Sequence, residues 1–118
     1  MAYVQGFVIP VPKAKKDAYK KLAELSAPIF QEYGALRIME NWSETTPDGK
    51  TTDFKRAVKA EDDEAVVFSW IEWADKATCD AAAEKMQNDP RWADMGDMPF
   101  DGKRMIYAGF DPIFSTDK

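Results

Sequence analysis

The segment 65–73 constrains the fold more than any other part of this sequence, because it is apolar on both sides that a β-strand presents. It is short and rich in β-branched and aromatic residues, which predicts a strand rather than a helix. Successive side chains of a strand point to opposite faces, and large apolar groups occupy both faces here. One face has Val66, Phe68 and Trp70, and the other has Val67, Ile71 and Trp73. A sheet built around this strand must therefore bury both of its faces.

The rest of the chain contains three further strand patterns and two amphipathic helix patterns. We predict strands over residues 3–11, 35–43, 65–73 and 105–110, and helices over residues 13–33 and 76–87. Gly34 is expected to end the first helix, and Asp75 to cap the second. This order of elements predicts a single domain, residues 1–118, with an α+β ferredoxin-like βαββαβ sandwich and an antiparallel sheet.

Three local signals refine this prediction. Pro10 lacks a backbone donor, so the first strand is expected to end at a sheet edge or beyond its pairing. Pro28 lies inside the first helix pattern, where we favour a kink near Ser26; the alternative is a second short helix that Ser26 caps. Residues 54–58 follow a turn signal at residues 47–49 and are predicted to return as a continuation of a strand.

The two apolar faces of the predicted strands also bear on assembly. The last strand repeats the pattern, since Ile106 and Phe110 oppose Met105 and Tyr107. Helices cover only one face of a ferredoxin-like sheet, so the other apolar face stays exposed in a monomer. Exposed apolar surface of that extent is typical of an interaction site. We therefore expect a homodimer packed through its sheet faces.

The charge of the chain argues against a nucleic-acid partner. There are 21 acidic and 16 basic residues, a formal net charge of -5, whereas proteins that bind phosphates usually have a basic excess. The one cluster of cations is interrupted by Asp17 and lacks an aromatic stacking motif. It consists of Lys13, Lys15, Lys16, Lys20 and Lys21. We expect a solvated helix face there and no nucleic-acid partner.

Residue usage also limits cofactors and location. Cys79 is the only cysteine and there is no histidine, which excludes an intrachain disulfide and imidazole ligation of zinc or haem iron. We expect no metal and no cofactor, with Cys79 as a packing residue of the second helix. The N-terminus lacks a signal-peptide pattern, and no window approaches the roughly 20 apolar residues of a membrane span. The expectation is a soluble cytoplasmic protein with no membrane partner.

Four blocks spread over the chain resemble a known family. They are YVQGFVIPVP (residues 3–12), TDFKRAVKA (52–60), VVFSWIEW (66–73) and MPFDGKRMIY (98–107). Together they are similar to the YbaA-like family of small bacterial proteins, a domain family of unknown function. The resemblance implies the dimeric α/β-barrel fold, whose superfamily includes cofactor-free monooxygenases, muconolactone isomerases, haem-degrading enzymes and stress-induced proteins. It implies no particular reaction for this chain.

The turn before the last strand is a candidate anion site. Arg104 has the planar fork that suits a carboxylate, Lys103 is a point charge, and Asp101 begins the turn. Strand alternation lets only one of the two cations face a given pocket. The alternative is a surface turn in which Arg104 pairs with a protein carboxylate.

Glu72 and Glu40 are the candidate acid or base groups. Each stands among large apolar residues of a predicted strand, where desolvation would raise the pKa of its carboxyl and suit it to proton transfer. The alternative is a buried ion pair with Arg37 or Arg56. Four aromatic residues are candidates to line a cavity, or alternatively belong to the core or a dimer interface. They are Tyr3, Trp70, Trp73 and Tyr107.

Two function classes follow from these candidates. The first is a cofactor-independent oxygenase or isomerase acting on a small molecule, with Glu72 as acid or base and Arg104 or Arg56 as anion partner. The alternative is a ligand-binding or stress-related dimer without turnover, in which these charges are structural. An RNA-associated protein is the third hypothesis, which the acidic charge disfavours.

Overall fold

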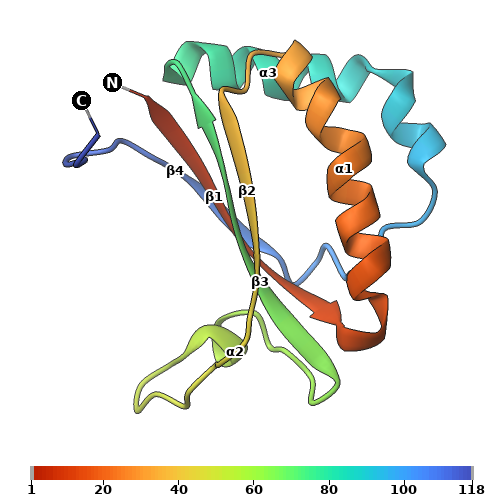
Figure 1. Ribbon diagram of the computed structural model, residues 1–118, viewed down its shortest axis with the longest axis vertical. Helices are drawn as coiled ribbons and strands as arrows, with labels where there is room; N and C mark the ends of the chain where they lie inside the picture. The colour runs from red at the N-terminus through yellow and green to blue at the C-terminus, as the bar shows by residue number, and fades with distance from the viewer. Residues whose placement is uncertain (1, 118) are drawn as a thin grey trace.

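A computed structural model describes residues 2–117, and it places a twisted four-stranded sheet beneath two long helices (Figure 1). All strand pairs are antiparallel, and the strand order is β2-β3-β1-β4. The elements are β1 (Tyr3–Pro12), η1 (Lys13–Lys15), α1 (Lys16–Glu32), β2 (Arg37–Trp42), α2 (Phe54–Ala57), β3 (Glu64–Trp73), α3 (Lys76–Asn88), η2 (Pro90–Met95) and β4 (Ile106–Phe110). The ferredoxin-like prediction is confirmed. Among residues 2–117 no helix is both long and apolar enough to cross a bilayer.

Pairing between the two central strands decides which residues face the helices. In β1 and β3, Ile9 lies opposite Val67 and Tyr3 lies opposite Trp73. Because side chains alternate, every second residue from these positions joins the same face. Trp73 and Val67 are each only 1% exposed, so this face forms the core together with α1 and α3.

The first helix packs on the sheet through the stripe that its sequence predicts. Its buried residues are Tyr19, Ser26 and Ile29, which recur at one or two helical turns. The helix continues through Pro28 without interruption, and the Ser26 hydroxyl donates to the carbonyl oxygen of Ala23 at 3.2 Å. The alternative in which Ser26 caps a second helix is therefore wrong.

The link between β2 and β3 corrects one prediction. Residues 54–57 form the short helix α2 instead of continuing a strand. Asp53 caps this helix by accepting a hydrogen bond from the backbone N–H of Arg56 at 2.8 Å. That bond, with a second from the N–H of Gly49, lowers the pKa of Asp53 to about 2. The local capping bond outweighs the extended propensity of the segment.

The sheet face opposite the helices remains largely uncovered, and we call it the open face. The link containing α2 projects from one end of the sheet (Figure 1), where the Phe54 ring packs edge-on against Phe68 at 6.2 Å. Even so, Phe68 is 46% exposed, and Phe110 on the same face is 54% exposed. The second apolar face expected from the sequence is therefore present in the folded chain.

Pro10 lies beyond the pairing of β1 with β4, but β1 does not end there as predicted, since it continues to Pro12 paired with β3. Pro10 sits opposite Val66 of β3, but on the other side β4 ends opposite Val8. Beyond Val8 the strand has a neighbour on one side only, so a residue without an N–H is tolerated there.

Two substitutions in α1 test how the helix contributes to the core. We expect Ile29→Ala to lower the free energy of unfolding by about 2–5 kcal/mol, because Ile29 is 6% exposed and its removal leaves a cavity. Leu25→Ala, at a residue that is 52% exposed, is expected to change it by less than about 0.5 kcal/mol. Urea denaturation of both variants measures this difference. Equal losses would contradict the packing described here.

Candidate functional site

A cavity of about 200 Å³ lies between the sheet and α1, and we call it the central cavity. It exists because α1 presents the small residues Ala23 and Ser26 between the larger Tyr19 and Phe30, so the helix does not fill the space above the strands. The cavity is lined by Phe7, Ile9, Tyr19, Leu22, Ala23, Ser26, Phe30, Glu40, Ser69, Ile71, Met86, Trp92, Met98, Phe100 and Met105. Its wall is apolar except for a small group of polar side chains.

Tyr19 and Glu40 form the centre of that polar group. The Tyr19 hydroxyl donates to Glu40 Oε1 at 2.7 Å. Glu40 reaches the helix side of the sheet because it pairs with Ser69, a residue on the core face of β3. Tyr19 reaches it from the inward stripe of α1. Helix α1 and the edge strand β2 thus bring together two titratable groups that are 21 residues apart in the sequence.

The surroundings shift the pKa values of both groups. Partial burial raises the pKa of the Glu40 carboxyl, and hydrogen bonds from Tyr19 and Ser69 oppose that rise. Burial, followed by the negative charge of Glu40, strongly raises the pKa of Tyr19. Tyr19 therefore keeps its proton at neutral pH and acts as a donor. Glu40 is the group that can accept or release a proton there.

A second hollow of about 340 Å³ adjoins the central cavity, and we call it the α1–β2 groove. It shares Tyr19, Ala23 and Glu40 with the central cavity. Its remaining lining residues are Lys16, Lys20, Asn41, Trp42 and Val67. Lys16 Nζ stands 5.6 Å from the centre of the Trp42 ring, in a cation–π arrangement. The Tyr19–Glu40 pair therefore has an apolar hollow on one side and a cationic one on the other.

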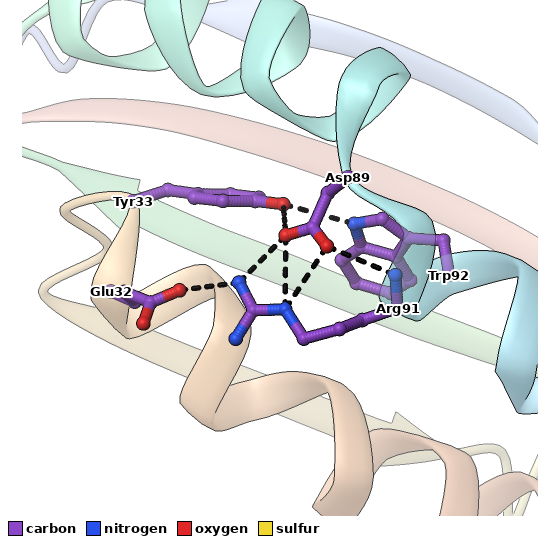
Figure 2. A network of polar contacts seen from close by, with 5 residues as sticks. All are labelled: Glu32, Tyr33, Asp89, Arg91 and Trp92. Atoms are coloured by element: carbon purple, nitrogen blue, oxygen red, sulfur yellow. Dashed lines mark hydrogen bonds and ion pairs between the residues drawn. The ribbon is translucent and has the colours of Figure 1, made fainter.

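The segment 89–105, which we call the cover segment, closes another side of the central cavity. Figure 2 shows the polar network at its start. Asp89 accepts hydrogen bonds from the Tyr33 hydroxyl at 2.5 Å and from Arg91 Nε at 3.0 Å, and Arg91 also pairs with Glu32. Arg91, together with Tyr33, holds the pKa of Asp89 well below its usual range.

The same network sets the position of an aromatic wall. Trp92 Nε1 donates to the Tyr33 hydroxyl at 3.1 Å (Figure 2). The Trp92 ring also packs on Phe30, with 5.1 Å between the ring centres. The network thus fixes the start of the cover segment against the end of α1. The far end is fixed by Arg104, as described next.

The sequence-predicted anion residues are engaged within the chain. Arg104 pairs with both oxygens of Glu64, at 2.6 and 2.7 Å, and with Asp101 at 3.0 Å. Because the Glu64 side chain is only 5% exposed, this fork anchors the end of the cover segment to the start of β3. Arg56 pairs with Asp53 at 3.0 Å in the α2 link. Arg104 thus pairs with a protein carboxylate, as in the alternative expected from the sequence, whereas Arg56 pairs with Asp53 and not with Glu40 or Glu72. Anion-binding roles for Arg104, Arg56 and Asp101 stay predictions.

Glu72 lies on the open face and not in the central cavity. Its carboxylate is 3.8 Å from Arg37 Nη1 and accepts a hydrogen bond from Trp70 Nε1 at 3.1 Å. The ion pair with Arg37 is one of the alternatives expected from the sequence. Trp70 belongs to the same face, where it packs on Phe68 at 5.6 Å. A catalytic role for Glu72 stays a prediction.

The two candidate tyrosines lie on the helix side, away from Glu40. Tyr3 pairs with Trp73 and extends its ring over Gly109, where a Cβ would stand 1.7 Å from the tyrosine oxygen. Gly109 is therefore required for this approach. Tyr107 packs against Phe7 at 6.2 Å near the β4 edge and is largely exposed. Binding roles for both tyrosines stay predictions.

The geometry thus gathers a different set of residues from the one the sequence favoured. Glu40 was a candidate from the sequence, whereas Tyr19 and Ser69 were not. One signal was available: Glu40 is in phase with Ile38 and Trp42, so it shares their face of the strand. Within residues 2–117 no three Cys, Asp or Glu side chains are grouped closely enough to hold a metal ion.

Comparisons with known proteins place the chain among relatives that match it nearly end to end. Residues 2–102 match the family described as "Protein of unknown function (DUF1428)". The uncharacterised protein YbaA of Escherichia coli K12 is 60% identical over 114 residues, which cover 96% of this chain and 97% of YbaA. YbaA of Shigella flexneri matches to the same extent.

A solved structure supports the fold. A protein from an uncultured marine organism, described as a dimeric ferredoxin-like protein, superposes with a TM-score of 0.55 at 10% identity. The match covers 92% of this chain and 91% of that protein. At this identity the likeness concerns the fold alone.

The raised pKa of Glu40 gives a stability test. A carboxyl whose pKa is higher in the folded state than its usual 4.5 destabilises the folded state as the pH rises and the group ionises. We therefore expect the free energy of unfolding of Glu40→Gln, taken relative to wild type, to increase as the pH rises from about 3 to 7. Urea denaturation across that range measures it. A difference that stays constant or falls with pH would contradict the desolvation of Glu40.

Proposed function

This chain belongs to the DUF1428 family of proteins of unknown function, and on that premise we propose that it binds a small, largely apolar molecule in the central cavity and transfers a proton with Glu40. The supporting observation is the Tyr19–Glu40 pair in the wall of an apolar cavity. Apolar pockets with a few convergent polar groups and shifted pKa values are typical of binding and catalytic sites.

The reaction class that suits this arrangement is a cofactor-independent isomerisation. Glu40 takes a proton from a substrate carbon next to a double bond and returns it to the far carbon of that double bond, while the electron pair of the broken C–H bond forms the new double bond between the first two carbons. No atom is gained or lost. Desolvation favours this role because a carboxyl with a raised pKa is a stronger base once ionised. An oxygenase reaction would begin with the same proton removal and then consume O₂.

The main alternative is a binding protein without turnover. The observation in its favour is that the Glu40 carboxyl already has a hydrogen bond from Tyr19 and a second partner in Ser69. Such a fully engaged group can be structural, since buried polar groups are normally paired.

We further propose that the open face packs against the open face of a second copy. The supporting observation is a continuous set of apolar residues from three adjacent strands, β3, β1 and β4. It comprises Val4, Val8, Phe68, Trp70, Ile106 and Phe110. The structural relative described as dimeric is consistent with this arrangement. In such a dimer, Glu72 and Trp70 lie at the interface.

A charge on the open face tests the dimer. We expect Phe68→Lys to convert the dimer to a monomer, because an ammonium group would be buried against apolar side chains. Leu25→Lys is the matched control, with a similar exposed fraction on the outer side of α1. Sedimentation equilibrium of both variants measures the subunit count. A wild-type monomer, or a Phe68→Lys variant that remains dimeric, would contradict the proposed interface.

Turnover can be tested before the substrate is known. A bacterial small-molecule extract is incubated with the protein in D₂O, and mass spectrometry identifies compounds that gain deuterium. We expect wild type to label at least one compound and Glu40→Gln to label none, because the deuteron is delivered by the Glu40 carboxyl. The Glu72→Gln variant should label as wild type does.

The same samples separate the alternatives. Native mass spectrometry of the protein purified from cells detects any small molecule that it retains. A retained molecule without deuterium labelling favours binding without turnover. The absence of both deuterium labelling and a retained molecule would contradict the proposal. Labelling that requires Glu72 and not Glu40 would place the base on the open face.

A further inference from the structure

The cations that stand free next to the Tyr19–Glu40 pair are lysines and not the arginines that the sequence favoured. Arg104, Arg56 and Arg91 are all engaged by protein carboxylates. Within residues 2–117, by contrast, neither Lys16 nor Lys20 has a carboxylate within salt-bridge distance, and both line the α1–β2 groove. The positive charges of Lys16 and Lys20 in the α1–β2 groove are therefore available to a ligand.

The position of the two lysines is defined by the helix and by an aromatic ring. Lys16 and Lys20 are separated by four residues, so they project from the same side of α1, one turn apart. The Trp42 ring holds the Lys16 ammonium near the groove by a cation–π contact. Tyr19 and Ala23, from the adjacent rows of the helix, form the boundary between the groove and the central cavity.

The charge balance of the groove selects a class of anion. Its lining contains two positive side chains and one carboxyl, Glu40, so an ionised Glu40 leaves one positive charge uncompensated. A singly charged anion restores neutrality, whereas a doubly charged phosphate would leave a net negative charge next to the partly buried Glu40. Lysines are point charges that suit a carboxylate without requiring a bidentate geometry.

We infer that the ligand of this site is an amphipathic monocarboxylic acid, whose apolar chain or ring fills the central cavity and whose carboxylate lies in the α1–β2 groove between Lys16 and Lys20. This inference rests on the proposed function and narrows its substrate class. It orients the ligand, because the carboxylate end stays in the groove and the adjoining carbons pass the Tyr19–Glu40 pair.

Isothermal titration calorimetry with two matched probes tests the inference. Octanoate and 1-octanol share an eight-carbon chain, and only octanoate has a charge. We expect octanoate to bind wild type about tenfold more tightly than 1-octanol, which corresponds to about 1.4 kcal/mol. The difference should shrink as salt is added, because the groove is open to solvent.

Two double variants locate the charge that is responsible. Lys16→Gln with Lys20→Gln is expected to abolish the preference for octanoate and to leave 1-octanol binding unchanged. Lys13→Gln with Lys21→Gln removes the same charge from the same part of the chain at residues that line neither hollow, and it should retain the preference. Circular dichroism of each variant confirms that α1 is intact.

The outcomes distinguish failure of the carboxylate inference from failure of the proposed function. Equal binding of octanoate and 1-octanol to wild type, or an equal loss of preference in both double variants, overturns the carboxylate inference and leaves the central cavity as a binding site. If Ala23→Trp, which places a large ring where the two hollows meet, does not weaken either probe, the ligand binds elsewhere and the inference is overturned. Failure of both probes to bind wild type counts against the inference and against the proposed function together.

Discussion

The antiparallel pairing of β1 with β3 is the constraint on which the rest of this structure depends. It joins Tyr3–Pro12 to Glu64–Trp73 over ten consecutive positions and places both strands in the middle of the sheet. A shift of one residue would send Val67, Ile71 and Trp73 to the open face and bring Phe68 and Trp70 under the helices. The helices, the cavity and the apolar open face all follow from that single register.

The two faces of the sheet have different roles because they are covered differently. Under the helices, large side chains fill most of the space, and the small residues Ala23 and Ser26 of α1 leave the central cavity. On the open face, nothing within residues 2–117 covers Phe68, Ile106 and Phe110 beyond the α2 link at one end. The first face therefore contains the proposed small-molecule site, and the second is the surface proposed to pack against a second copy of the chain.

Arginine pairs hold the cover segment in place at both ends. Arg91 joins the start of the segment to Asp89 and Glu32, and Arg104 joins its end to the nearly buried Glu64. Between these anchors, apolar side chains such as Trp92 and Phe100 line the central cavity. In this arrangement Arg104, which resembles an anion site in sequence, has carboxylate partners within the chain, whereas Lys16 and Lys20 of α1 have none within salt-bridge distance among residues 2–117.

The sequence by itself determined the four strands, the two long helices, their order and the two apolar faces, because these depend on local periodicity, although it missed the short helix α2. It also indicated that Pro10 is not fully paired on both sides, since a missing N–H is a local property; the β4 pairing stops at Val8, while the β3 pairing continues to Pro12. Only the tertiary structure decided which carboxylate meets the cavity. Glu40 and Glu72 have similar neighbours in sequence, but the pairing of β2 with β3 sends one under α1 and the other to the open face. Likewise, Arg104 and Glu64 are 40 residues apart, and no local pattern reveals that each is the partner of the other.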